Sequence, residues 1–312
     1  MKARLLTLAI VATGIVVGGS PIHAQDATGL APAVTATGTT LAAAASGIAT
    51  PDPAAQIEEL ARLFRAGDLA ALAQASIPPS QWQHIRAAWD LERREPITDA
   101  ERVRFAEKFA RITAPDAVDR IMAEVEPKLE EARPQVPGAM LMGFGAMHMA
   151  IASPDSDLTD AQRTALEAAL PGLQRWAGAT DFLDAATLRD ALTLLVDAVR
   201  RSGVQNLDQL RALSFDELLR RGGGVLAAAK DAVQLYGVDV DAIADSVRVE
   251  VLENDGETAR VRTTVTVFGA PVFGEHDLVL VDGRWYGKQA VVQWSHDDAD
   301  TDTAGENEPV EG

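Results

Sequence analysis

Apolar positions recur with a helical period between about residues 54 and 236. They fall three and four positions apart, as on one face of an α-helix. Clear examples are Ile57, Leu60, Ala61 and Phe64, then Val118, Ile121, Met122, Val125 and Leu129, and finally Leu188, Leu192, Leu195 and Val199. The pattern predicts a multi-helix lobe over 54–236. Pro127 and Pro171 are expected to kink or end helices.

Capping sequences mark expected helix starts inside this lobe. Four hydroxyl residues are followed three positions later by Glu or Gln, namely Ser80/Gln83, Thr98/Glu101, Thr159/Gln162 and Ser214/Glu217. This spacing is typical of a capping box. Gly222-Gly223-Gly224 lacks the Lys-Ser/Thr of a phosphate loop and predicts a helix C-cap followed by a hinge. Trp82, Ile85 and Trp89 form a stripe expected in the core.

After Gly237 the apolar period changes to two, which predicts strands. Turn dipeptides separate four of them within 237–294, at about Ser246 to Asn254, Thr258 to Phe268, Pro271 to Val281 and Arg284 to Val292. Adjacent strands joined by short turns form an antiparallel β-meander. The fold class is therefore α+β, and we expect helices of the lobe to cover the apolar face of the sheet.

Turn lengths fix a predicted register for this sheet. Two-residue turns at Gly269-Ala270 and Asp282-Gly283, with a longer first loop, place Val249 opposite Thr263, Thr263 opposite His276, and His276 opposite Gln289. On the other face the same register forms one row of alternating charge, made of Glu250, Arg262, Asp277 and Lys288. Opposite charges directly across a ladder are favourable, which supports this register.

The candidate ligand-binding residues are Thr263, His276 and Gln289. His276 is the one titratable side chain on the predicted apolar face, and an imidazole beside a hydroxyl and an amide could bind a small polar ligand or transfer a proton. No carboxylate is expected on that face. A core histidine held by its two neighbours is therefore the favoured interpretation.

Residues 138–152 contain four methionines and a histidine: Met140, Met142, Met147, Met149 and His148. Thioethers are ligands that copper(I) accepts, so a metal site is one interpretation. Helical spacing, however, points Met142 and Met149 away from Met140 and Met147. A helix that is apolar all round is most often buried, so these methionines are expected in the core, without a metal.

No other motif carries recognisable chemistry. Asp155, Asp157 and Asp160, like Asp239, Asp241 and Asp245, lack the glycine and final glutamate of a calcium loop and are expected to cap helices or turns. Neither G-x-S-x-G nor H-E-x-x-H occurs, and no cofactor motif is found. The sequence therefore favours a protein that is not an enzyme.

The two ends of the chain predict its compartment. Lys2 and Arg4 precede an apolar run from Leu5 to Val17, and Ala24 provides a small residue before Gln25, which is typical of a cleavable signal peptide over 1–24. A flexible leader rich in Ala, Thr, Gly and Pro is expected over 25–53, and an acidic disordered tail over 295–312. The mature chain is predicted to be periplasmic, soluble and without a membrane span.

The net charge and the cysteine content restrict the partners and the chemistry that we expect. The net charge of −18 repels phosphate backbones, which excludes nucleic acid as an expected partner. The chain has no cysteine, which excludes disulfides and thiolate chemistry.

The stretch "DGETARVRTTVTVFG" followed by "HDLVLVDGRWYGKQ" resembles the strand half of small exported bacterial domains with a nuclear-transport-factor-like or cystatin-like curved sheet. Many such domains are not catalytic, whereas relatives such as ketosteroid isomerase use Tyr and Asp in the concavity of the sheet. Here Tyr286 is expected on the outer face and no Asp on the inner one. The resemblance therefore implies the sheet without that catalytic set.

Together these features predict a non-enzymatic binding or interaction role in the cell envelope. The expected partner is an envelope protein or a small molecule. The alternative is a small-ligand receptor or enzyme that uses the inner face of the sheet around His276. A cavity of roughly 300 Å³ or more that reaches this ring would favour the alternative.

Overall fold

The computed structural model describes residues 51–156 and 158–292, in which a helical lobe precedes a four-stranded antiparallel sheet. The predicted α+β class is confirmed. The helices are α2 (Pro53–Ala66), α3 (Leu69–Ser76), α4 (Pro79–Glu92), α5 (Asp99–Thr113), α6 (Ala117–Ala132), the 3₁₀ helix η1 (Arg133–Gln135), α7 (Val136–Ala152), α8 (Asp160–Ala179), α9 (Ala185–Arg201), α10 (Leu207–Ala212), α11 (Phe215–Gln234) and α12 (Val240–Asp245). The strands are β1 (Arg248–Asn254), β2 (Thr258–Val267), β3 (Ala270–Val281) and β4 (Arg284–Gly287).

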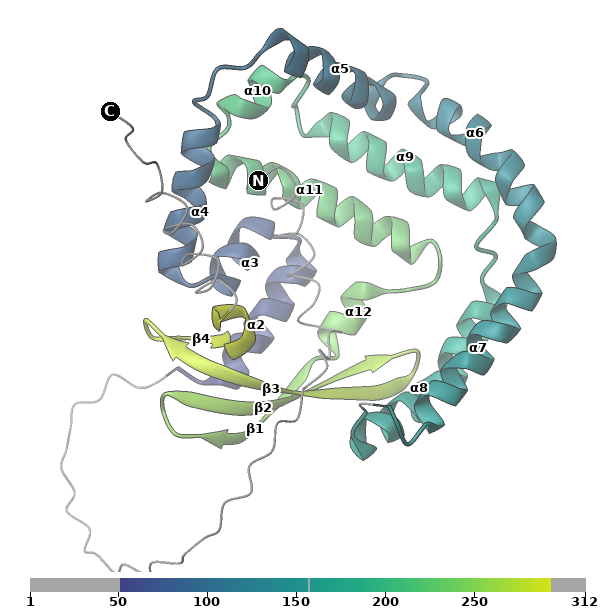
Figure 1. The fold of residues 1–312 in the computed structure, drawn as a ribbon, viewed down its shortest axis with the longest axis vertical. Coiled ribbons are helices and arrows are strands. Elements are labelled where there is room, and N and C mark those ends of the chain that lie inside the picture. The colour runs from purple at the N-terminus through teal and green to yellow at the C-terminus, as the bar shows by residue number, and fades with distance from the viewer. Residues whose placement is uncertain (1–50, 157, 293–312) are drawn as a thin grey trace, which may run out of the picture.

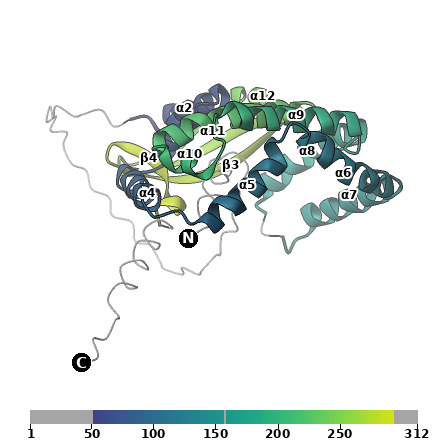
Figure 2. The ribbon, with the colours of Figure 1, turned by 90° about the horizontal axis from the view of Figure 1, so that it is seen from above.

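The helices form an outer arc and an inner pair above the sheet. In Figure 1, α4, α5, α6 and α7 follow one another around α9 and α11, while the sheet closes the opposite side. Figure 2 shows that the molecule is flattened. None of the helices in the described ranges is long and apolar enough to cross a membrane. The predicted signal peptide, nearly all of the leader and the acidic tail lie outside the described residues.

Several predicted helix starts are confirmed. Thr98 and Thr159 form complete capping boxes at α5 and α8. Ser214 accepts a hydrogen bond from the backbone of Glu217 at α11, although the Glu217 side chain binds Arg220 and Arg221 instead of reaching back. The Ser80 start is wrong, because α4 begins at Pro79. Proline favours the first helical position, where its missing N–H needs no partner.

Neither internal proline ends its helix. Pro127 lies inside α6 and Pro171 inside α8, and both are exposed. The carbonyl that each proline leaves without an N–H partner can therefore bond to water, which reduces the penalty. The structure therefore excludes a helix end at either proline.

One core cluster joins the start of the lobe to α11. Trp82 and Trp89 of α4 pack with Phe215 and Leu219 of α11, together with Ala73 and Ile77. The rings of Trp82 and Phe215 meet edge to face at 5.3 Å, and Trp89 Nε1 donates to the carbonyl of Leu213 at 3.0 Å. The predicted tryptophan stripe is thus confirmed as core.

Three consecutive glycines lie in the middle of α11, so the predicted C-cap and hinge at Gly222–Gly224 is wrong. Close packing explains their presence. A Cβ on Gly223 would lie 2.7 Å from the carbonyl oxygen of Gly67, in the turn between α2 and α3. Because α11 has no side chain at this point, it can approach that turn closely. The glycines therefore allow close packing and do not break the helix.

The sheet has the order β1-β2-β3-β4, and two of its three pairings have the predicted register. Val249 faces Thr263 and Glu250 faces Arg262 between β1 and β2. Between β3 and β4, Val281 faces Arg284, as the Asp282-Gly283 turn predicts.

The register between β2 and β3 differs from the prediction by two residues. Thr263 faces Gly274, and His276 faces Val261, so the predicted Thr263–His276 pair is wrong. The turn residues are Phe268 and Gly269, with φ of 51° and 81°, in place of Gly269-Ala270. Tertiary contacts hold Phe268 in this unusual conformation, because its ring lies 4.9 Å from that of Trp176 on α8.

The predicted charge row changes with this register. Arg262 pairs with Glu275 at 2.8 Å and with Glu250 at 3.3 Å, whereas Asp277 pairs with Arg260 at 3.3 Å. Strand β4 ends at Gly287, and residues 288–292 are helical. The positions predicted for Lys288 and Gln289 in the sheet are therefore wrong. In a helical turn the backbone N–H and C=O groups form hydrogen bonds with one another, whereas an edge strand pairs its backbone groups on one side only.

Helices cover the apolar face of the sheet, as predicted. Ile57 of α2 packs on a cluster of buried residues made of Ala259, Val261, Leu278 and Trp285. The Gln56 side chain bonds to both backbone groups of Trp285, and Trp285 Nε1 donates to the carbonyl of Pro51 at 2.6 Å. These contacts join the first described helix to the last strand.

Candidate functional site

His276 lies on the helix-covered face of β3, as predicted, and is half-buried. Its ring extends over Gly274, where an added Cβ would lie 3.3 Å from Nε2. Within the described part of the chain, the ring has no hydrogen-bond partner. Burial lowers the pKa of His276 below its ordinary value of 6.5, and the nearby charge of Asp277 opposes this in part. The ring is therefore neutral at pH 7.

The three candidate ligand-binding residues do not form one site. Thr263 faces Gly274 across the ladder, and Gln289 lies in the helical segment after β4, where it is exposed. Two described cavities lie elsewhere, and neither is lined by any of these three residues. The shift in register and the short β4 together separate the groups.

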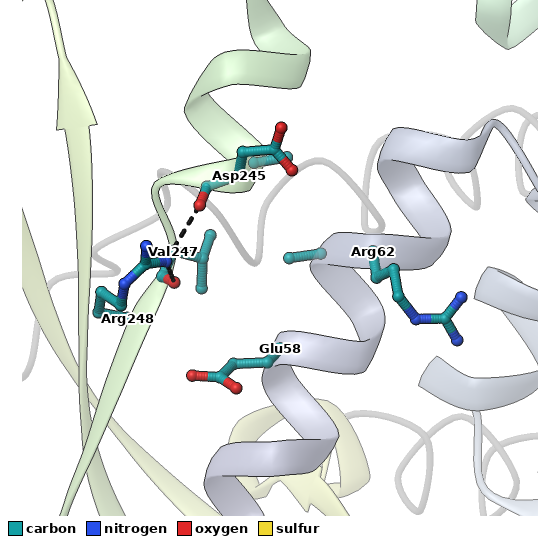
Figure 3. A pocket seen from close by; sticks show the side chains of 7 residues that line it. Glu58, Arg62, Asp245, Val247 and Arg248 are labelled. Atoms are coloured by element: carbon teal, nitrogen blue, oxygen red, sulfur yellow. Dashed lines mark hydrogen bonds between the residues drawn. The ribbon is translucent and has the colours of Figure 1, made fainter.

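The first cavity, about 320 Å³, lies between α2, α12 and the start of β1 (Figure 3). It is lined by Glu58, Ala61, Arg62, Ala244, Asp245, Val247 and Arg248. Arg248 Nη1 donates to the carbonyls of Asp245 and Val247 at 3.0 and 2.6 Å, and Arg62 points away from Glu58. Asp245 also accepts from Arg65 at 2.9 Å.

The chemistry available in this first cavity is limited. Its arginines are engaged by protein groups, since Arg62 pairs with Glu59 and Arg248 with backbone carbonyls. Its lining contains no hydroxyl, imidazole or thiol that could act as a nucleophile beside a base. The described residues contain no cluster of three or more His, Cys, Asp or Glu placed to hold a metal.

The second cavity, about 520 Å³, lies at the end of the β1–β2 hairpin. Asp255 and Arg260, two of its polar residues, form bonds within the sheet and its turn. Asp255 accepts from the backbone N–H groups of Glu257 and Thr258 and from the Thr258 hydroxyl, and these bonds lower the pKa of Asp255 to about 2. Arg260 pairs with Asp277 and Glu253. These residues hold the turn and the strand pairing.

The exposure of helix α7 also differs from the prediction made from the sequence. Leu141, Met142 and Met149 are 76%, 73% and 75% exposed, and Met147 is 40% exposed, so the prediction of a core position is wrong for three of the four methionines. Met140 is half-buried. α7 packs only against α8 and η1 among the elements with substantial contact, through a side that carries Phe144 and buried Ile151. Within the described ranges, most of the remaining circumference of α7 is exposed.

The exposed side of α7 is also free of charge. The helix has no Asp, Glu, Lys or Arg over its 17 residues, and a Cβ added at Gly138, Gly143 or Gly145 would meet no atom within 4 Å. His148 contacts Gln174 of α8 at 3.2 Å. Met142 and Met149 are two turns apart, roughly 10 Å along the axis, which is too far for both to bind one ion.

No signal in the sequence distinguished an uncovered helix from a buried one, because both are apolar all round. Comparison with known proteins adds no assignment: no family model, no curated protein and no solved structure matches the chain. The geometry of the described residues is therefore the basis for inferring a function.

Proposed function

We propose that this protein has a non-enzymatic interaction role in the cell envelope and contacts its partner through the outer face of α7. We define the α7 outer face by Gly138, Leu141, Met142, Gly145 and Met149. The observation that carries the proposal is the exposure of three large apolar side chains, each about three-quarters accessible, on one uncharged helix. Contiguous exposed apolar surface of this kind marks interaction sites in folded proteins.

The other candidate sites support this choice by their chemistry. In the first cavity Asp245 pairs with Arg65 and Arg248 with backbone carbonyls, and in the second cavity Asp255 holds the hairpin turn. The alternative function needs a cavity that reaches His276. Neither of the two cavities does, and the half-buried ring packs over Gly274.

Placement in the envelope rests on the first 24 residues of the sequence. A charged start, an apolar run and a small residue at the exit favour export and cleavage between Ala24 and Gln25. N-terminal sequencing of protein recovered from the periplasmic fraction tests this part. A cytoplasmic product that retains Met1 would contradict it.

Photocrosslinking from α7 in living cells tests the interaction role. A photoreactive amino acid in place of Met142 should give a discrete adduct on irradiation. Leu91 of α4 is the matched control, because it is also a large apolar helix residue and is 67% exposed. An adduct from position 142 but not from position 91 would support the proposal. No adduct from position 142, or equal adducts from both, would overturn it.

A further inference from the structure

We infer that the partner of the α7 outer face is a second copy of this chain, paired antiparallel along α7. This inference rests on the proposed function and adds the identity of the partner. Three features of α7 carry it: the order of large and small residues, the absence of charge, and the position of the helix at the edge of the molecule.

Large and small residues alternate along one line of the helix. Gly138, Met142, Gly145, Met149 and Ala152 are all exposed and follow spacings of four, three, four and three. This is the spacing of the contact line in paired helices, where a side chain of one helix fills a space between side chains of the other. Gly138 and Gly145 each leave such a space, since among the described residues no atom beyond the adjacent helix backbone lies within 4 Å of the missing Cβ.

The alternation is complementary to itself. In a twofold antiparallel pair, the same surface occurs on both copies, so residue i faces residue j and j faces i. With the axis passing between Gly143 and Phe144, Met142 lies over Gly145 of the second copy. The same axis places Met149 over Gly138 of the second copy. Every large side chain on the line then meets a glycine.

Charge favours this surface over others for contact between copies. The whole chain carries a net charge of −18, so two copies repel each other. α7 is a 17-residue stretch without a charged side chain. Figure 2 shows α6 and α7 at one edge of the flattened molecule, so two copies joined along α7 keep their acidic bodies on opposite sides.

The available area predicts a weak, reversible dimer. Taking roughly 100 Å² of apolar area for a fully exposed Leu or Met side chain, the three exposed side chains of each copy give about 450 Å² across the pair. Stable interfaces bury about 1,200 Å² or more in total. We therefore expect a dissociation constant on the order of 100 μM.

Sedimentation velocity of the full mature chain between about 10 μM and 1 mM tests the inference. Gly145→Glu and Gly143→Glu form a matched pair, because both sites lie in α7 and both have open space around them. The two positions point about 160° apart around the helix, so only Gly145 lies on the contact line. We expect the wild type and Gly143→Glu to dimerise alike, and Gly145→Glu to weaken dimerisation at least tenfold. Circular dichroism checks that both variants fold.

A wild type that stays monomeric at 1 mM would overturn the inference, and so would an equal effect of the two substitutions. If the chain stays monomeric while position 142 gives an adduct with a different protein in cells, the second copy is excluded and the proposed interaction role stands. If neither the dimer nor the adduct is found, both the inference and the proposed function fail.

Discussion

Alanine substitutions at the three glycines of α11 test how closely this helix packs on the turn between α2 and α3. Gly224 has open space around its Cα, so alanine there should stabilise the protein by about 0.5–1 kcal/mol through helix propensity. At Gly223 the same gain is opposed, because the new Cβ would lie 2.7 Å from the Gly67 carbonyl oxygen. Overpacking of this kind costs about 1–3 kcal/mol, so a net loss of about 1 kcal/mol is expected.

Hydrogen bonds hold the turn at Gly67 in place, so moving it away from α11 would cost free energy. Gly67 has a φ of 69°, its N–H donates to the Phe64 carbonyl at 3.0 Å, and its carbonyl accepts from Leu69 at 3.0 Å. Buried Lys230 also donates to the Phe64 and Arg65 carbonyls at the end of α2. The obstacle is therefore backbone that several hydrogen bonds hold in place.

Gly222 provides the intermediate case. There the new Cβ would meet the flexible end of the Leu69 side chain at 3.0 Å, so a stability close to wild type is expected. Urea unfolding followed by far-UV circular dichroism gives the midpoint and slope for each variant. The expected order of stability is Gly224→Ala, then Gly222→Ala, then Gly223→Ala. A Gly223→Ala variant as stable as Gly224→Ala would refute the reasoning.

Three further predictions concern the sheet. His276 should titrate below pH 6.5 by NMR, and because the unfolded chain then binds more protons than the folded protein, the free energy of unfolding should fall as the pH drops below 6.5. A normal pKa together with ligand-induced shifts would favour the alternative function. Asp255, with a pKa of about 2 against 3.8 ordinarily, should stabilise the fold above about pH 4, so the difference in urea midpoint from Asp255→Ala should shrink from pH 4 to 2; a constant difference would argue against the turn bonds. Double-mutant cycles should detect coupling of Arg262 with Glu275 but none with Asp277, and the reverse result would restore the register predicted from sequence.

Periodicity predicted most of the fold because it reports which face of an element is covered. The register of the β1–β2 pair follows from the alternation of apolar and polar residues, whereas the identity of α2 as a helix that packs on the sheet does not. Periodicity cannot choose between turns one residue apart. Phe268 takes a left-handed conformation that a local preference would not select, because Trp176 of α8 packs on its ring.

The candidate site was less predictable, because its parts depend on contacts distant in sequence. Thr263 and His276 depend on the β2–β3 register, and Gln289 on where β4 ends. α7 shows a second limit: its composition indicates an apolar environment but does not say whether the same chain supplies it. An apolar composition favours burial of a helix, but the number of elements that pack around the helix determines whether it is buried.

The bonds between α2 and β4 also constrain when this chain can fold. Gln56 contacts Trp285 across 229 residues of sequence, and Pro51 does so across 234. Closing so long a loop has an entropic cost that is recovered only once both ends are present, and contacts of this separation slow folding. During synthesis, α2 leaves the ribosome long before the strand that covers its apolar face exists. The bonds between α2 and β4 can therefore form only after the last strand is available, and a chain truncated before Arg284 would leave Ile57 without the Trp285 side of its cluster.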